Sequence, residues 1–588
     1  MKKKSAKNHF GHGGAKAQRK NPRTLRLCGM IVFISFSIML PSQNLEKIGK
    51  KEMVTVGGGM NFNSVFYDAQ GFPMRRDPYT WYFNGNLNIN VLDVSLPFTF
   101  SYSNLHGTYT QPFNMQSCSP KYKWAQAHIG TTAMNFSSYT LAGHIFTGGG
   151  IELTPNGFYF GAMYGRLNKA VEYNLVDNSS ENMAFKRMGL AGKIGYDKNG
   201  NSISMTYFTA KDDAKSLMFI PVGTNLSPAQ NSAISFSGKV KLSKCFSVEG
   251  EFAVSGLTRN ILSETETTDF SGMEKFLLPT KSTTQFFKAY KGSVGYAGKN
   301  ISVSINHEHV DPDYQTFGAY YFNNDLDNWT IAPSFRMLKG KLSIAFNTGW
   351  QHNNLDGTKL TTAHRWVGST NVSFTPNKKW IFTSSYSNFT TFTNRRLQSD
   401  PFWQASPADT LSFYQIAQQA NTSIIHSFGK TNFKHCISLI GSYQLTGTQQ
   451  NLLVQSNAVV LNGNCAYSLQ FVKTKTSVSI IGNYNRSESG MLLTELFGPG
   501  MQVLQTLCNG TLRVSAGSSY NRSYSNEILM SNILSHRAQF SYAPKVKKKI
   551  YGKPSLSLNA IYVNRFPIVR TQATTGELTI TVNLGLNF

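Results

Sequence analysis

The sequence contains few charged residues and only one long apolar run. Asp, Glu, Lys and Arg together make up 15% of 588 residues, and the mean hydropathy is −0.26. The apolar run covers residues 27–40, and it is shorter than the roughly 20 residues that a membrane-spanning helix needs. These deficits exclude a protein built from membrane-spanning helices.

Cysteine is also scarce. Cys28 lies in the N-terminal apolar run, and the remaining five are odd in number and lack CxxC or Cys/His ligand spacing. We interpret them as small residues of a β-sheet wall, with one or two disulfides as the alternative. The five are Cys118, Cys245, Cys436, Cys465 and Cys508.

The N-terminus has the composition of a secretory signal. Residues 1–26 hold nine Lys and Arg and no acid, and the apolar run follows directly. This order predicts a signal peptide over 1–42, which leaves 43–588 as the mature protein. A lipid anchor on Cys28 is disfavoured because the apolar run follows that cysteine instead of preceding it.

The net charge is strongly positive. The whole chain carries +27, and the part after residue 42 has 48 Lys and Arg against 30 Asp and Glu, or +18. Such a balance usually indicates nucleic-acid binding. Here the surplus is spread through turns and strands, and secretion removes that partner, so we expect no nucleic acid.

The C-terminus alternates between apolar and small polar residues and ends on an aromatic residue. Successive strand side chains point to opposite faces, so this segment has one wholly apolar face, as a transmembrane β-barrel strand requires. It resembles the recognition strand that the barrel-assembly machinery reads in bacterial outer-membrane proteins. The predicted assembly signal comprises Leu578, Ile580, Val582, Leu584, Leu586 and Phe588.

Two hairpins can be given a register. A two-residue turn at Leu92 and Asp93 pairs Val91 with Val94 and puts all the apolar residues of both strands on one face. A three-residue turn at 243–245 pairs Val240 with Val248 and places Lys239 across from Glu249. A Lys near the bilayer centre costs roughly 2–4 kcal/mol, so Lys239 and Glu249 are predicted to face the lumen.

Similar strands recur along the chain, which holds 49 Gly, 27 Tyr and 41 Phe. Short turns rich in Lys and Gly alternate with long polar connections, as in bacterial barrels with periplasmic turns and extracellular loops. The fold predicted is all-β, a transmembrane antiparallel β-barrel of 22–24 strands (range 18–26) over 43–588. Residues 487–501 are predicted to form one of the long loops. Residues 125–166 are less regular, and they form either wall or a chain folded into the lumen.

Several motifs resemble a known family. They include Asp77-Pro78, the run Lys121-Tyr122-Lys123-Trp124, Ala162 through Arg166, and Tyr562 through Phe566. Together they look like uncharacterised outer-membrane barrel proteins of the Bacteroidota over nearly the whole mature chain. The resemblance implies a fold and a place in the outer membrane, without a substrate.

Candidate chemistry is sparse. His307 and His309 share a strand face, which favours an interfacial aromatic pair over a metal site. The loop acids Asp311, Asp313, Asp325 and Asp327 are interpreted as solvated, with calcium binding as the alternative. No nucleotide or hydrolase motif is present. We therefore expect no enzyme, no cofactor and no bound metal.

Three function classes remain. A barrel of this size encloses a lumen too wide for its own wall side chains to fill, so a passive pore or transport channel of unknown solute comes first. The alternative is a barrel that holds a protein partner or plug in an export or surface-assembly complex. TonB-dependent uptake ranks last. Residues 52–56 faintly resemble its energy-coupling box, but barrel strands begin too early for a plug. Expected partners are outer-membrane lipid and the barrel-assembly machinery.

Overall fold

A computed structural model describes residues 54–104, 114–173, 183–266, 274–320, 323–359, 362, 364–389, 391–393, 414–446, 458–546, 552–569 and 572–588. The predicted signal peptide lies outside these residues. Residues Val56–Phe588 form one of two compact units of the chain. Among the described residues, no helix has the length and apolar character to cross a membrane.

The described chain is almost entirely strand. The strands are β1 Val54–Gln70, β2 Tyr79–Val91, β3 Val94–Ser103, β4 Met115–Cys118, β5 Lys121–Tyr122, β6 Ala125–Asn135, β7 Ala142–Leu153, β8 Phe158–Asn168, β9 Arg187–Lys198, β10 Asn201–Asp212, β11 Gln230–Lys241, β12 Phe246–Thr258, β13 Thr284–Ala297, β14 Ile301–Val310, β15 Leu326–Met337, β16 Leu342–His352, β17 His364–Asn377, β18 Trp380–Ser387, β19 Thr391–Thr393, β20 Tyr414–Gly429, β21 Phe433–Thr446, β22 Ala458–Phe471, β23 Thr476–Ser489, β24 Leu492–Leu507, β25 Leu512–Ser525, β26 Ile528–Tyr542, β27 Lys553–Pro567 and β28 Thr575–Asn587. Short helical turns are α2 Glu274–Leu277, η2 Pro155–Gly157, η3 Leu338–Gly340 and η5 Cys508–Gly510.

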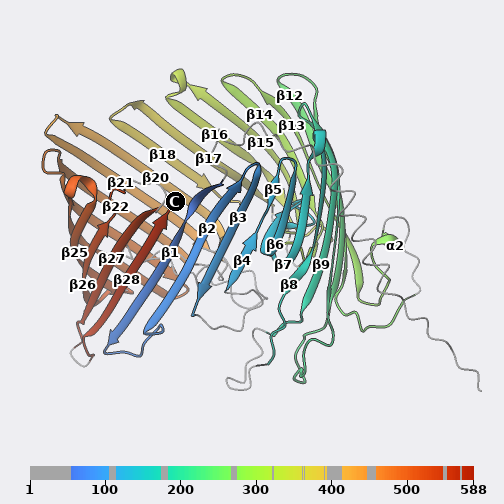
Figure 1. Cartoon of the computed structure of the whole chain (residues 1–588), viewed down its shortest axis with the longest axis horizontal. Coiled ribbons are helices and arrows are strands. Elements are labelled where there is room, and N and C mark those ends of the chain that lie inside the picture. Colours follow the sequence, from blue (N-terminus) through green and yellow to red (C-terminus); the bar gives the residue numbers. More distant parts are fainter. Residues whose placement is uncertain are drawn as a thin grey trace, which may run out of the picture. The chain divides into compact units, whose positions relative to one another are not determined.

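These segments form one closed antiparallel barrel (Figure 1). β4 and β5 together form one wall strand between β3 and β6, and β18 and β19 form another beside β20. The wall therefore has 26 strands. This confirms the predicted fold, with a count at the upper limit of the range and above 22–24.

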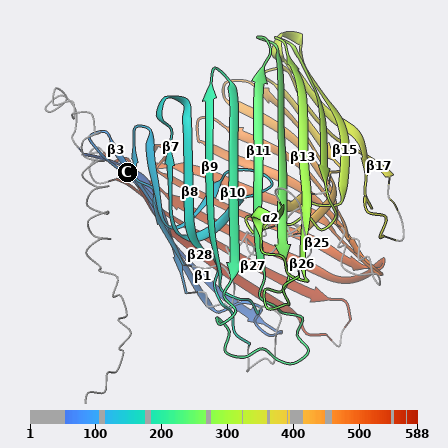
Figure 2. The same ribbon diagram turned by 90° about the vertical axis from the view of Figure 1, so that its right-hand side faces the viewer.

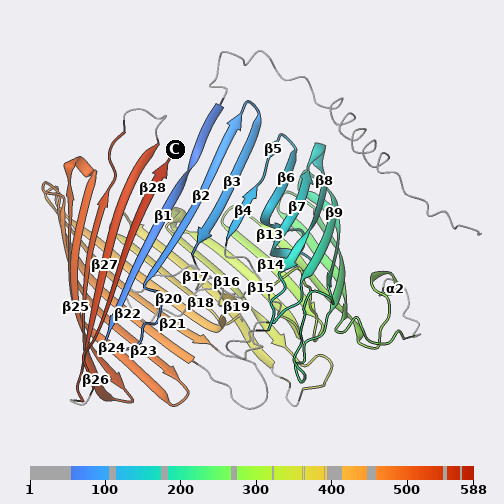
Figure 3. The same ribbon diagram turned by 60° about the horizontal axis from the view of Figure 1, so that its bottom comes forward.

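The first and last strands close the barrel. β28 pairs with β27 on one side and with β1 on the other, through twelve residue pairs from Gly59 with Asn587 to Gln70 with Gly576. Figure 3 shows β28 beside β1. Continuous pairing leaves no free sheet edge at this junction.

Both predicted hairpin registers are confirmed. Val91 pairs with Val94 across the turn at Leu92 and Asp93. Val240 pairs with Val248, and the Lys239 and Glu249 side chains form an ion pair of 2.8 Å between Nζ and Oε2. The apolar pattern of each strand fixes these registers, because a one-residue slip would move every apolar side chain to the other face of the sheet.

Short turns and long connections alternate from β8 to β22, as predicted. From β22 to β26 four short turns follow one another instead, and one predicted loop is wrong. Residues 487–501 belong to β23 and β24, joined by a tight turn at 490–491. The Gly498-Pro499-Gly500 run suggested a loop, but the ladder to β25 is interrupted only at residues 498–499 and resumes in the same register. Proline lacks the N–H that the ladder would use, and this local break does not end the strand.

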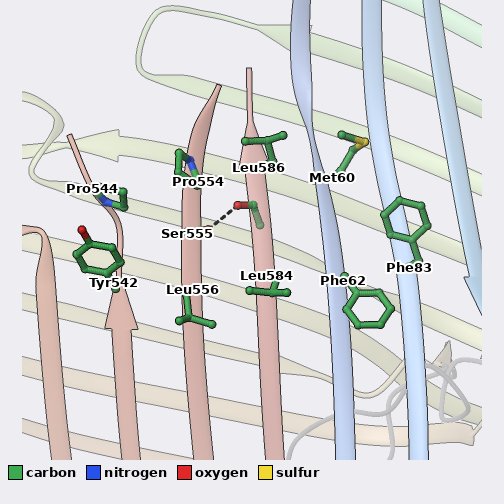
Figure 4. A pocket seen from close by; sticks show the side chains of 11 residues that line it. Met60, Phe62, Phe83, Tyr542, Pro544, Pro554, Ser555, Leu556, Leu584 and Leu586 are labelled. Atoms are coloured by element: carbon green, nitrogen blue, oxygen red, sulfur yellow. Dashed lines mark hydrogen bonds between the residues drawn. The ribbon is translucent and has the colours of Figure 1, made fainter. Parts of the chain in front are cut away.

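The wall has two chemically distinct faces, because successive side chains alternate. We call the face that carries Val240 the apolar face and the face that carries Lys239 the polar face. On the apolar face, Val240 is 50% and Ile305 52% exposed. Near the junction of β28 and β1 this face is hollowed by an apolar groove of about 370 Å³, lined by residues that include Phe62, Leu584 and Leu586 (Figure 4).

The segment that contains α2 also packs on the apolar face. Leu277 forms a buried cluster with Ile234 of β11 and Val254 of β12, and Figure 2 shows α2 in front of this part of the wall. The neighbouring Phe276 is 92% exposed. In the apolar run 276–278, Leu277 and Leu278 are therefore buried and Phe276 is exposed.

Candidate functional site: a shelf on the polar face

Two connecting segments lie against the polar face of strands β7 to β14. Residues 136–141 connect β6 to β7, and residues 311–320 belong to the connection between β14 and β15. We call these two segments together the shelf. Tyr139, Leu141 and Tyr314 are at most 1% exposed, so the shelf is firmly packed and does not project into solvent.

Part of the wall beneath the shelf consists of small apolar residues. Ala233, Ala253 and Ala289 lie on the polar face and are fully buried. Tyr139 and Tyr314 pack against Ala253 and Ala289. Short side chains at these positions let the shelf approach the strands closely.

The two shelf segments bind each other, although they lie about 175 residues apart in the sequence. Leu141 and Gly318 form a parallel bridge. The Tyr314 hydroxyl donates to the Tyr139 carbonyl at 2.7 Å, and the Thr316 hydroxyl donates to the Thr140 carbonyl at 2.6 Å. A Cβ on Gly318 would lie 2.3 Å from the Thr140 carbonyl oxygen, so this close approach requires glycine.

Asn231 of β11 joins the shelf to the wall. Its buried side-chain amide donates to Ser255 Oγ and the Gly256 carbonyl, each at 2.8 Å, and its oxygen accepts the Phe317 N–H at 3.0 Å. The Ser255 hydroxyl in turn donates to the Gln315 carbonyl at 2.6 Å. One amide therefore satisfies backbone groups of the shelf that would otherwise be buried without partners.

Charged side chains of the wall bind the other shelf segment, residues 136–141. Lys193 Nζ donates to the Phe136 carbonyl at 2.6 Å, and Lys291 Nζ donates to Ser138 Oγ at 2.8 Å. Glu251 accepts from the Ser137 hydroxyl and pairs with Lys291 at 3.1 Å. Because these groups are partly buried, their bonds are stronger than equivalent surface contacts.

An ion pair lies under the far end of the shelf. Arg187 of β9 forms a bidentate pair with Asp212 of β10, at 2.7 and 3.0 Å. The guanidinium carbon lies 3.5 Å from the centroid of the Phe317 ring. The flat face of the Arg187 guanidinium thus contacts the Phe317 ring of the shelf, while the edge of the guanidinium binds the buried carboxylate of Asp212.

Ionisation of the shelf tyrosines is suppressed. Burial raises the pKa of Tyr139 above its ordinary value, and the nearby carboxylate of Glu308, which accepts the Tyr139 hydroxyl at 2.8 Å, raises it further. Burial likewise raises the pKa of Tyr314. Both hydroxyls therefore remain hydrogen-bond donors at neutral pH.

The predicted site residues lie elsewhere. Lys239 and Glu249 are paired on the polar face beyond the shelf, toward the turn at 242–245. The row from Leu578 to Leu586 continues the apolar face, opposite residues such as Phe62 and Phe66 of β1. Among the residues that the structure describes, neither set has a hydrogen bond or ion pair to the shelf. Their predicted roles as lumen-facing pair and assembly signal remain predictions.

The histidines and loop acids are engaged with one another and with aromatic rings. His307 stacks on Trp329, and His309 stacks on Tyr290. Both imidazoles contact Asp327 Oδ2, at 3.2 and 2.9 Å. Asp325 pairs with Lys359. Within the described ranges, no group of three or more His, Cys, Asp or Glu has metal-binding geometry.

The shelf itself was only partly foreseen. Residues 125–166 were predicted to be either wall or inserted chain, and the structure contains both: strands β6 to β8 and the segment 136–141 between β6 and β7. Asn231, Lys291 and the segment 311–320 were missed. The buried alanines beneath the shelf were a usable signal, because uncharged small residues on a polar face indicate that something covers them.

The polar face is open in another sector. On β20 to β24 it presents Ser, Thr, Asn and Gln, and Ile440 on this face is 49% exposed. Ala253 and Ala289 on β12 and β13 are fully buried by comparison. The shelf therefore covers one sector of the polar face. It leaves most of this one accessible, although Val460 and Asn485 here are 2% and 8% exposed.

No protein-family model and no curated protein matches the sequence. Solved structures that are similar include a chain of the Escherichia coli P pilus tip assembly intermediate PapC-PapD-PapK-PapG, at 10% identity and a TM-score of 0.38, with 90% of this chain covered. The chain spans 60% of the length of that match.

Two Pseudomonas aeruginosa structures are similar over most of both chains. OccK9 (OpdG) has 8% identity and a TM-score of 0.29, with 91% of this chain and 98% of that chain covered. A mutant of the ferric enterobactin receptor PfeA has 9% identity and a TM-score of 0.39, with 92% and 81% covered. At these values the similarity assigns no activity, and the Bacteroidota resemblance remains a prediction.

Proposed function

We propose that this protein is an outer-membrane β-barrel that forms a passive pore narrowed by the shelf. The observation that carries the proposal is the division of a closed barrel wall into two faces. A closed wall has one face inside and one outside, and a face with half-exposed Val240 and Ile305 is favourable only against hydrocarbon. The polar face then lines the lumen, with the shelf against one sector of it.

The position of the shelf favours an open pore rather than a sealed barrel. It covers β7 to β14, whereas residues such as Ile440 on β20 to β24 are exposed on the same face. Its hydrogen bonds to Asn231, Lys193 and Lys291 hold it in one place. The shelf therefore acts as a fixed constriction, and the solute passes along the uncovered wall.

Planar-bilayer recording of the purified protein tests the proposal. A pore gives stepwise ion currents that persist without added partners. Absence of current from folded, heat-modifiable protein would contradict it and favour a plugged or partner-holding barrel. The control is protein heated in detergent before reconstitution.

A partner-holding barrel is the second candidate, because connecting segments expose large apolar side chains. Met218 is 98%, Val222 104% and Phe276 92% exposed. Side chains of this kind favour contact with a protein. Isolation of the barrel from its native membrane after cross-linking, followed by mass spectrometry, tests for a stoichiometric partner.

Uptake driven by TonB is less favoured. Val54 to Val56, in the segment that resembles an energy-coupling box, are part of wall strand β1. We expect no enzymatic activity, since the shelf binds its own polar groups and not a reactive centre.

A further inference from the structure

The open sector of the polar face is uncharged. Across the described residues of β20 to β24, the only Lys, Arg, Asp or Glu on this face is Lys434, which pairs with Gly429 beside a turn. We call this sector the neutral wall. It differs sharply from the sector under the shelf, where Lys193, Glu251 and Lys291 lie.

Side-chain amides form two adjacent rows across the neutral wall. Asn421, Ser442, Asn462 and Asn485 are paired in one row, and Ser423, Ile440, Asn464 and Asn483 in the next. Asn464 Nδ2 donates to Asn483 Oδ1 at 2.7 Å, and Asn485 Nδ2 donates to Asn462 Oδ1 at 2.5 Å. Asn462 Nδ2 also donates to Ser442 Oγ at 3.1 Å.

These bonds orient the amides without exhausting them. An Asn side chain has two donor hydrogens and an acceptor oxygen with two lone pairs, so one or two cross-strand bonds leave donors and acceptors for a solute. Amide donors and acceptors are then present in both rows, with Ile440 as an apolar member of the second row, and without a fixed charge. A polyhydroxylated solute, whose hydroxyls both donate and accept, matches this pattern.

We infer that the neutral wall binds neutral polyhydroxylated solutes, of the class of oligosaccharides, as they pass through the barrel. This inference rests on the proposed pore and names its substrate class. A charged solute gains nothing from an uncharged wall and loses part of its hydration there. A sugar exchanges hydrogen bonds with water for hydrogen bonds with Asn462, Asn464 and Asn483 at little cost.

Current block in planar bilayers tests this inference, with maltotriose as the probe and trilysine as the charged comparison. Maltotriose is expected to reduce the ion current in a concentration-dependent way, and trilysine is not. The double variant Asn462→Ala/Asn483→Ala should raise the half-blocking concentration of maltotriose by roughly two- to tenfold, the loss of one hydrogen bond.

The matched control removes a cross-strand polar pair from the other face of the wall, between β18 and β20 at the border of the neutral wall. Ser384 and Thr422 are hydrogen-bonded at 3.1 Å and lie on the apolar face. The variant Ser384→Ala/Thr422→Ala should leave maltotriose block unchanged. The single variant Asn464→Asp, which adds one negative charge, should shift the reversal potential in a KCl gradient toward cation selectivity. It tests whether the neutral wall borders the ion path even if the double variant folds poorly.

The outcomes separate the two proposals. Normal currents without maltotriose block, stronger block by trilysine, or an equal shift in the control variant would overturn the neutral-wall inference and leave the pore intact. An unchanged reversal potential in Asn464→Asp would also overturn it. Absence of any current from the folded wild type contradicts the pore itself.

Discussion

The Phe588 N–H donates a hydrogen bond of 2.9 Å to the carbonyl of Gly58. The last residue of the sequence is thus bonded to the first strand of the wall, at the point where the barrel closes. Phe588 is 39% exposed, so its ring remains available to other molecules after this bond forms.

Deletion of Phe588 should lower the fraction of folded barrel. The change removes the closing bond to Gly58 and the aromatic end of the row predicted to be the assembly signal. Heat-modifiable migration of membrane-extracted protein on gels measures the folded fraction, and Phe588→Tyr is the conservative control. Normal accumulation of folded protein without Phe588 would show that this strand is not a signal.

Val240→Arg should destabilise the barrel by roughly 2–4 kcal/mol, because it puts a charge into hydrocarbon. Lys239→Ala should have a mild effect, since its ion pair with Glu249 is about half exposed on both sides and such pairs contribute about 0–1 kcal/mol. Denaturant unfolding in detergent or lipid compares the two variants. Equal destabilisation by the two variants would contradict the assignment of Val240 to the lipid face and Lys239 to the lumen.

Asn231→Leu should release residues 315–317 from the wall. The variant loses the amide that binds Ser255, Gly256 and Phe317, and buried backbone groups without partners cost about 1–3 kcal/mol each. We expect a larger or noisier single-channel conductance with the barrel still folded. Asn225→Leu, at an exposed position of the segment between β10 and β11, is the control. An unchanged conductance would show that the shelf does not border the ion path.

The shelf should weaken at high pH. The pKa values of Tyr139 and Tyr314 are raised in the folded protein, whereas unfolded tyrosine ionises near pH 10. Their stabilising effect is therefore complete at neutral pH and is lost as the pH rises above about 10. Unfolding measured between pH 8 and 11 should show this loss, and Tyr314→Phe should show a smaller one. A pH-independent difference between the two proteins would contradict the assignment.

Gly349→Ala should destabilise the β15 and β16 pair. A Cβ at Gly349 would lie 1.8 Å from the Trp329 carbonyl oxygen, and relieving such an overlap costs about 1–3 kcal/mol or more. Gly441→Ala is the matched control, because its nearest neighbour would be 3.9 Å away. The difference in denaturant midpoint between the two variants measures the effect.

Much of the wall could be predicted from the sequence, because a strand's two faces alternate strictly. The registers at Val91 with Val94 and at Val240 with Val248 required only that apolar residues share one face. The predicted number of strands was lower than the observed number partly because Gly498 and Pro499 led to the prediction of a loop in place of β24. Local residue preference was overridden there by pairing with β23 and β25.

The shelf could not be predicted from local pattern. Its two segments meet through contacts such as Tyr314 with Tyr139, and no periodicity in either segment indicates the other. Asn231 looked like any polar residue of a lumen-facing strand. Its fully buried amide becomes meaningful only when the segment 315–317 is seen above it.

An even number of wall strands has a consequence for how the protein enters the membrane. The start of β1 and the end of β28 lie at the same rim, which is also the rim of the short turns at 92–93, 199–200 and 298–300. In the proposed orientation, a chain delivered from that side carries the connections of the opposite rim through the bilayer, namely the long polar connections together with the short turns at 490–491 and 526–527. The energetic barrier to insertion is then concentrated in those polar segments, so lengthening one of them should slow insertion more than adding the same residues to a short turn.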